Sequence, residues 1–121
     1  MAFTLTINNV DFSAYIQQKT DIAEQMRRVE TVENAIDGTL ITILDAIKWD
    51  PSFLLKPLPK SMMQTLIGMM QLETVTMTYA SVVSNTDRTI TAKPESIRVQ
   101  YATTFQGEDI YADTPISFLE V

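Results

Sequence analysis

The residues of this chain that could do chemistry are mainly carboxylates, because none of its 121 residues is cysteine or histidine. Without histidine, the chain lacks the commonest general base near neutral pH and the commonest zinc ligand. The densest acidic group is Glu108, Asp109 and Asp113. Calcium loops place oxygen ligands at alternate positions around a glycine, and this group does not follow that spacing. The sequence therefore predicts a solvated acidic loop, no cofactor and no enzymatic activity.

A second polar cluster surrounds a strong turn signal, Asp37-Gly38. Two interpretations remain open for it: a hydrophilic turn in solvent, or the tip of a hairpin that reaches into a partner subunit. Adjacent arginines precede the turn, and in an extended strand they point to opposite faces, so at least one of them could lie in an interface. The candidate interface residues are Arg27, Arg28, Glu30, Glu33, Asn34, Asp37 and Gly38.

The composition restricts the possible partners. The formal net charge is -6 and the pI is about 4.4. Affinity for nucleic acids comes largely from Lys and Arg, so we expect no specific nucleic-acid binding.

The apolar runs are too short to cross a bilayer, and the first residues lack the basic start and long apolar block of a signal peptide. Isolated glycines at 38, 68 and 107 make no phosphate-binding loop. We expect neither a membrane nor a small-molecule substrate.

The segment from about 21 to 49 is predicted to form a long β-hairpin. Its first part, 21–29, is ambiguous, because the apolar residues recur at spacings of four and then three, as in a helix. We favour a strand, since Asp37-Gly38 indicates a turn and residues 39–44 are rich in β-branched side chains. Asp50-Pro51 is expected to interrupt the returning strand.

One short helix is predicted at about 59–71, because Pro57 and Pro59 exclude a helix before them and permit one directly after. Thr103–Asp113 is expected to be a loop. We expect one domain over residues 1–121 of a mainly β (α+β) class, an antiparallel β-sandwich or small barrel flanked by the helix. Alternating apolar residues predict the remaining strands, at about 3–7, 75–79, 89–93, 97–101 and 116–121. Pro94 is expected to stop the strand at 89–93.

Three segments carry a resemblance of layout: the opening Phe3–Ser13, the turn Asn34–Thr39, and Pro57-Leu58 before the helix followed by Val75–Tyr79. In these the chain resembles small tail-region structural proteins of long-tailed bacteriophages and prophages, with a tail-tube-like or distal-tail-like β-domain. Asn9 stands where such openings usually have glycine. The resemblance implies a non-enzymatic virion structural protein that forms a ring in the tail or its distal baseplate end. It implies assembly in the host bacterial cytoplasm, with itself and neighbouring tail proteins as partners.

The charge and the hairpin agree with this implication. An acidic wall would let DNA slide past without adhering, and a long hairpin could add strands to a neighbouring subunit. The alternative function is a small-ligand or carbohydrate-binding β-module. Such sites usually present aromatic side chains on one exposed face. The aromatic residues available for this are Tyr15, Trp49, Tyr79, Tyr101 and Tyr111.

Overall fold

The computed structural model describes residues 3–34, 36 and 38–121, which form a mainly β structure with one α-helix. The helix α1 spans Lys60–Met70, and single 3-10 turns lie at Ser13–Tyr15 and Lys19–Asp21. The strands are β1 Leu5–Ile7, β2 Val10–Asp11, β3 Ile22–Asn34, β4 Leu40–Leu55, β5 Val75–Ala80, β6 Asp87–Ile97, β7 Tyr101–Phe105, β8 Glu108–Tyr111 and β9 Thr114–Glu120.

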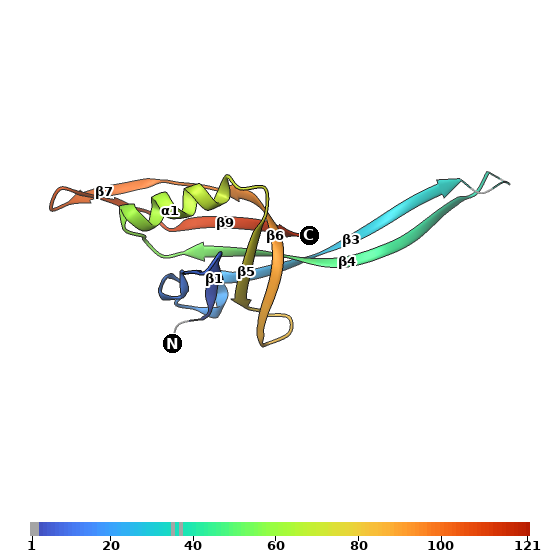
Figure 1. Ribbon diagram of the computed structural model, residues 1–121, viewed down its shortest axis with the longest axis horizontal. Coiled ribbons are helices and arrows are strands. Elements are labelled where there is room, and N and C mark those ends of the chain that lie inside the picture. The colour runs from blue at the N-terminus through green and yellow to red at the C-terminus, as the bar shows by residue number, and fades with distance from the viewer. Residues whose placement is uncertain (1–2, 35, 37) are drawn as a thin grey trace.

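Seven strands form one antiparallel sheet in the order β2-β1-β5-β6-β9-β4-β3, and β7 and β8 form a separate two-stranded sheet (Figure 1). The predicted fold class is confirmed: antiparallel, mainly β, with one helix and a long hairpin. The described residues contain no closed barrel. Residues 21–29, which were ambiguous from their spacing, lie almost entirely in the strand β3.

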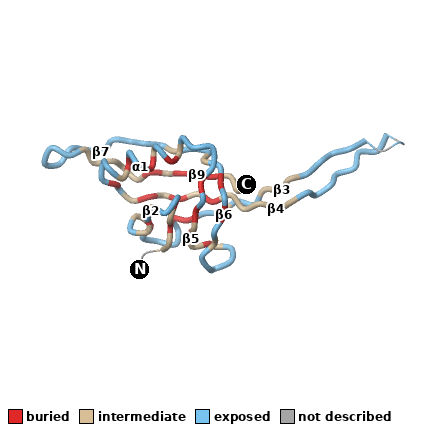
Figure 2. The backbone as a smooth tube through the Cα atoms, in the orientation of Figure 1, coloured by how far each residue is buried: buried red, intermediate tan, exposed pale blue. Residues whose placement is uncertain are grey.

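The large sheet is strongly curled. The rings of Phe53 in β4 and Tyr79 in β5 lie with their centroids 5.5 Å apart, in an edge-to-face arrangement. These strands are three places apart in the sheet order. Since neighbouring strands are about 4.8 Å apart, a flat sheet would separate them by roughly 14 Å. The sheet therefore folds over its own inner face, and the buried residues gather there (Figure 2).

The helix α1 closes the core and lies where the proline pattern predicts a helix. It begins directly after Pro59, and its buried residues Met63, Leu66 and Met69 recur at spacings of three. Two of these are methionines, whose unbranched side chains fill irregular gaps between packed elements. The helix therefore contributes to the core and is held mainly by tertiary contacts, since a helix of this length is marginal alone.

The expected strand ends at two prolines were wrong. The strand β4 continues through Pro51. Pairing with β9 begins one residue later, at Ser52, so the missing N–H removes no bond from that ladder. The strand β6 likewise continues past Pro94, where its register against β9 shifts. A register shift of this kind is a position that tolerates proline.

The expected loop at Thr103–Asp113 was also wrong, because most of it belongs to the β7-β8 hairpin. Gln106 and Gly107 connect the two strands with φ of 53° and 77°. Positive φ at both central residues is typical of the tight turns that join antiparallel strands. The strand expected at 97–101 is also divided, since β6 ends at Ile97 and β7 begins at Tyr101.

Two leucines near the helix test this core. We expect Leu66→Ala to lower the free energy of unfolding by about 2–5 kcal/mol, because it leaves a cavity in the core. Leu66 is fully buried, whereas Leu72, just beyond the helix, is 47% exposed. Leu72→Ala should change the value by about 0.5 kcal/mol or less. Urea denaturation of the two variants measures both values, and equal losses would contradict the described packing.

Candidate interface: the projecting hairpin

The β3-β4 hairpin extends far beyond the rest of the molecule (Figure 1). Its strands pair from Ile22 and Phe53 out to Asn34 and Leu40. On the other side of β4, the neighbour β9 pairs only with Ser52–Leu55. We call the described residues between 27 and 48 the arm. Beyond the body, the arm is a two-stranded ribbon with no third strand beside it in the described part of the chain.

Most residues of the arm are exposed (Figure 2), and several of them have large apolar side chains. Successive residues of a strand point to opposite faces, so Leu40 and Ile41 lie on different sides of the ribbon. Single exposed apolar residues are normal, but a contiguous set marks a contact surface. Because β4 presents apolar side chains on both faces of the ribbon, this strand resembles one that is covered on both sides. The exposed set is Val32, Ile36, Leu40, Ile41, Ile43, Leu44 and Ile47.

The residues predicted to form the interface are distributed over the arm. Asp37 lies outside the described residues. Gly38 has φ of +85°, a left-handed conformation that favours glycine in the turn. Arg28 forms an ion pair with Glu30, two residues along the same strand. Their contact with a partner stays a prediction. The exposed members of the predicted set are Arg28, Glu30, Glu33, Asn34 and Gly38.

Arg27 instead fixes the base of the arm to the body. Its Nε lies 2.9 Å from Oδ2 of Asp50, and its Nη2 donates to the main-chain oxygen of Glu120 at 2.7 Å. The Asp50 carboxylate also accepts a hydrogen bond from the Glu120 N–H at 2.9 Å. Hydrogen bonding to Asp50 raises the pKa of Arg27. This arginine therefore joins β3, β4 and β9 where the arm leaves the sheet.

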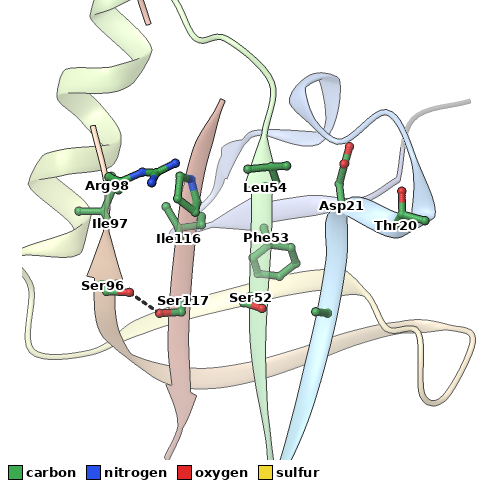
Figure 3. A pocket seen from close by; sticks show the side chains of 12 residues that line it. Thr20, Asp21, Ser52, Phe53, Leu54, Ser96, Ile97, Arg98, Ile116 and Ser117 are labelled. Carbon is green, nitrogen blue, oxygen red and sulfur yellow. Dashed lines mark hydrogen bonds between the residues drawn. The ribbon is translucent and has the colours of Figure 1, made fainter. Parts of the chain in front are cut away.

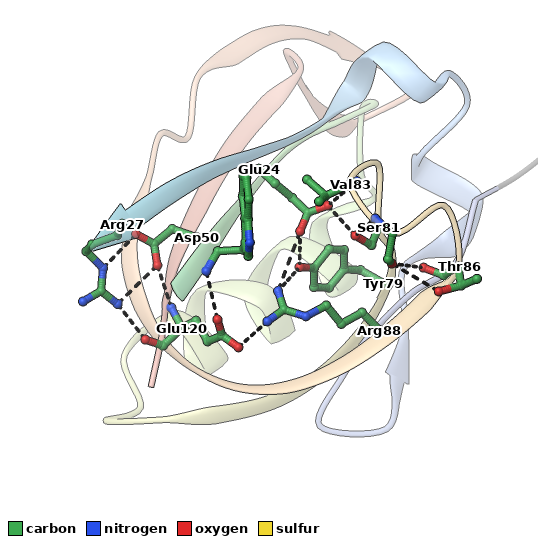
Figure 4. Close-up of polar contacts among 11 residues, drawn as sticks. Glu24, Arg27, Asp50, Tyr79, Ser81, Val83, Thr86, Arg88 and Glu120 are labelled. Atoms are coloured by element: carbon green, nitrogen blue, oxygen red, sulfur yellow. Dashed lines mark hydrogen bonds and ion pairs between the residues drawn. The ribbon is translucent and has the colours of Figure 1, made fainter. Parts of the chain in front are cut away.

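Glu24 links the edge strand β3 to the opposite side of the curled sheet (Figure 4). Its side chain is 1% exposed. Its carboxylate accepts hydrogen bonds from the Tyr79 hydroxyl at 2.8 Å, the Ser81 hydroxyl at 2.6 Å and the Val83 N–H at 3.1 Å. Nη1 of Arg88 lies 3.7 Å away. Burial raises the pKa of Glu24, but the hydrogen bonds outweigh it, and the net pKa is lowered.

Arg88 continues this network to the last strand. It donates to the Tyr79 hydroxyl at 3.0 Å and forms an ion pair with Glu120. Glu120 also accepts a hydrogen bond from the Trp49 N–H at 2.9 Å. Burial raises the pKa of Glu120, but the hydrogen bonds from Arg88 and from the Trp49 N–H lower it by more, so the net pKa is lowered. The pKa of Tyr79 is raised mainly by burial and, as the second cause, by its hydrogen bond to Glu24. We call Glu24, Tyr79, Arg88, Glu120, Asp50 and Arg27 the closing network.

A shallow groove of about 350 Å³ crosses the outer face of β3, β4, β9 and β6 (Figure 3). Its floor includes a row of small residues, because Ala23 pairs with Ser52, Ser52 with Ser117 and Ser117 with Ser96. The hydroxyls of Ser96 and Ser117 lie 2.6 Å apart and hydrogen-bond to each other. Neither serine is therefore paired with a base that could activate it as a nucleophile.

Within the described ranges, no group of three or more acidic side chains is placed to hold a metal ion. No helix in the described part of the chain is long and apolar enough to cross a membrane. Comparison of the chain with protein-family models and with curated proteins finds no match.

Sequence reasoning missed two features of this surface. The first is the exposed apolar side of the arm, on β4. Its signal was the run Leu40–Leu44, which is apolar on both faces and has no charge. The second is the β7-β8 hairpin, where Tyr101 is 57% and Phe105 61% exposed. Its signal was Gln106-Gly107 between two short segments, one rich in threonine and aromatic residues.

The closing network makes stability depend on pH. Because the pKa of Glu24 is lowered in the folded protein, its ionised carboxylate stabilises the fold at pH values above 4.5, the ordinary pKa of the group. This stabilisation is lost as the pH falls through the folded-state pKa. We expect Glu24→Gln to lower the free energy of unfolding by about 1.5–3 kcal/mol at neutral pH, because it removes charged hydrogen bonds. The difference from wild type should shrink below pH 4.5.

Urea denaturation at a series of pH values measures this difference. Glu73→Gln is the matched control, because Glu73 is exposed beyond the helix. It should stay within about 0.5 kcal/mol of wild type at every pH. A Glu24→Gln deficit that is independent of pH would show that its ionisation does not contribute.

Proposed function

We propose that this chain is a non-enzymatic structural subunit of a bacteriophage tail. Its copies form a ring in the tail or at its distal, baseplate end, with neighbouring tail proteins as further partners. The subunit is assembled in the cytoplasm of the host bacterium and stays in the virion tail. The observation that carries this proposal is the arm, which projects from a compact β-body and exposes apolar side chains on both faces.

An arm of this kind is suited to subunit contacts. In water it stands as an isolated two-stranded ribbon, which is at best marginally stable. A neighbouring subunit would supply both the apolar cover and the further strands that the ribbon lacks. The base is held by Arg27, Asp50 and Glu120. A fixed base and an uncovered tip are what a subunit needs in order to reach a neighbour in a defined direction.

The charge supports the same proposal. With a net charge of -6, the subunit carries little of the positive surface that binds phosphates. Like charges keep a polyanion such as DNA mobile beside it. An acidic ring would therefore form a conduit to which DNA does not adhere.

The alternative, a carbohydrate-binding module, has less support from the geometry. Such a site needs exposed aromatic side chains together on one face. Tyr79 is fully buried, and the exposed Tyr101 lies on β7, at the end of the molecule away from the arm (Figure 1). A glycan array tests this alternative, and specific binding of a sugar would favour it over a tail subunit.

The proposal predicts that the purified chain self-associates at high concentration through the arm. We expect the triple variant Ile41→Ser, Ile43→Ser, Leu44→Ser to remain monomeric, because it removes exposed apolar side chains from both faces of the arm. Leu72→Ser with Val83→Ser is the control, since these residues are 47% and 52% exposed but lie off the arm. The control should assemble like the wild type in sedimentation velocity.

The proposal also predicts complexes with neighbouring tail proteins. Co-expression with the proteins encoded beside it, followed by native mass spectrometry, should give closed rings or ring-bearing complexes. The proposal fails if the chain stays monomeric at high concentration and forms no complex with these proteins.

A further inference from the structure

Strands with an open edge in this structure differ in how they are protected against pairing with another chain. Native proteins protect such edges with charges, or keep them short. The outer edge strand β3 carries Arg27, Arg28, Glu30 and Glu33, and β2 has only two residues. On the small sheet, β8 carries Glu108 and Asp109. We call these charged or short edges guarded, because they resist pairing with another chain.

Two open edges have no such protection. One is Leu40–Leu44 of β4, on the side away from β3, where the described chain provides no partner strand. The other is Tyr101–Phe105 of β7, on the side away from β8. Both segments have five residues and no charge, and all of their residues are exposed. Such edges aggregate unless another strand covers them.

The two unguarded edges match each other. At about 3.4 Å per residue, each offers roughly 17 Å of strand for pairing. They lie at opposite ends of the molecule (Figure 1), so one chain cannot join them to each other. In a sheet ordered β3-β4-β7-β8, the uncharged segments of β4 and β7 would lie inside and the charged strands β3 and β8 outside. Each marginal two-stranded ribbon would also gain the further strands that independent stability requires.

We propose that Leu40–Leu44 of one copy pairs with Tyr101–Phe105 of a second copy, to form a continuous four-stranded sheet across the subunit boundary. This pairing rests on the proposed function, because it names the surfaces through which the ring assembles. The contact is heterologous, so every copy offers one arm and one β7-β8 hairpin, and repetition closes a ring when the rotation allows it. Pairing of β4 with β4, or of β7 with β7, would leave the other unguarded edge open.

Two charge variants test the pairing. Ile43→Lys places a charge on the arm edge, and Thr103→Lys places one on the hairpin edge. Each variant keeps one functional edge, so each alone should lose assembly. An equimolar mixture of the two should give a 1:1 heterodimer in native mass spectrometry, because it contains a single intact pair of edges. Thr91→Lys, at an exposed position of β6, is the control and should assemble like the wild type.

The outcomes separate this inference from the proposed function. Circular dichroism first establishes that each variant keeps the wild-type β-structure. A mixture that contains only monomers, or a single variant that still assembles, overturns the pairing. If the wild type forms rings in those same conditions, the proposed function stands and only the assigned surfaces are wrong. A wild type that neither self-associates nor binds neighbouring tail proteins overturns both.

Discussion

The closure of the curled sheet by the buried carboxylate of Glu24 is the constraint on which the rest of the structure depends. One sheet and one short helix bury enough apolar surface only if the sheet folds over its inner face, as the contact between Phe53 and Tyr79 requires. Glu24 joins the edge strand β3 to Tyr79 and Ser81 across that face. Loss of one of these hydrogen-bond partners would leave a buried acceptor unsatisfied, which typically costs about 1–3 kcal/mol. The same closure fixes the direction in which β3 and β4 leave the body.

Stability therefore decreases along the β3-β4 hairpin. At its base, Arg27 and Asp50 connect the two strands to Glu120 in β9. Further out, the ladder between β3 and β4 shifts register between Val29 and Glu30, and neither strand has another neighbour in the described chain. Segments with few buried contacts open at low free energy. In the proposed assembly, the body anchors the arm at its base and a partner covers its outer part, so that association stabilises the outer ladder.

Local sequence patterns predicted the elements but not their closure. The period-two alternation of β5 and the proline pair before α1 act within a few residues, so both elements were recognised. The strand ends predicted at Pro51 and Pro94 were wrong, because the effect of a proline depends on where a neighbouring strand begins or where the pairing register shifts. Both are properties of the tertiary structure. The closing network joins Glu24 to Tyr79, 55 residues away, and Arg88 to Glu120, 32 residues away. No local period brings such residues together.

In the proposed assembly, the placement of charge lets copies with a net charge of -6 associate. At physiological salt, repulsion between exposed charges is screened beyond about 8 Å. Short-range contacts then decide which surfaces meet. Within the described residues, β3 and β8 carry charges, whereas the two segments of the proposed pairing, Leu40–Leu44 and Tyr101–Phe105, carry none. The charges thus suppress pairing at the wrong edges, while main-chain hydrogen bonds and apolar side chains remain available at two ends of the molecule. Specificity of this kind comes from repulsion at unwanted contacts as much as from attraction at the intended one.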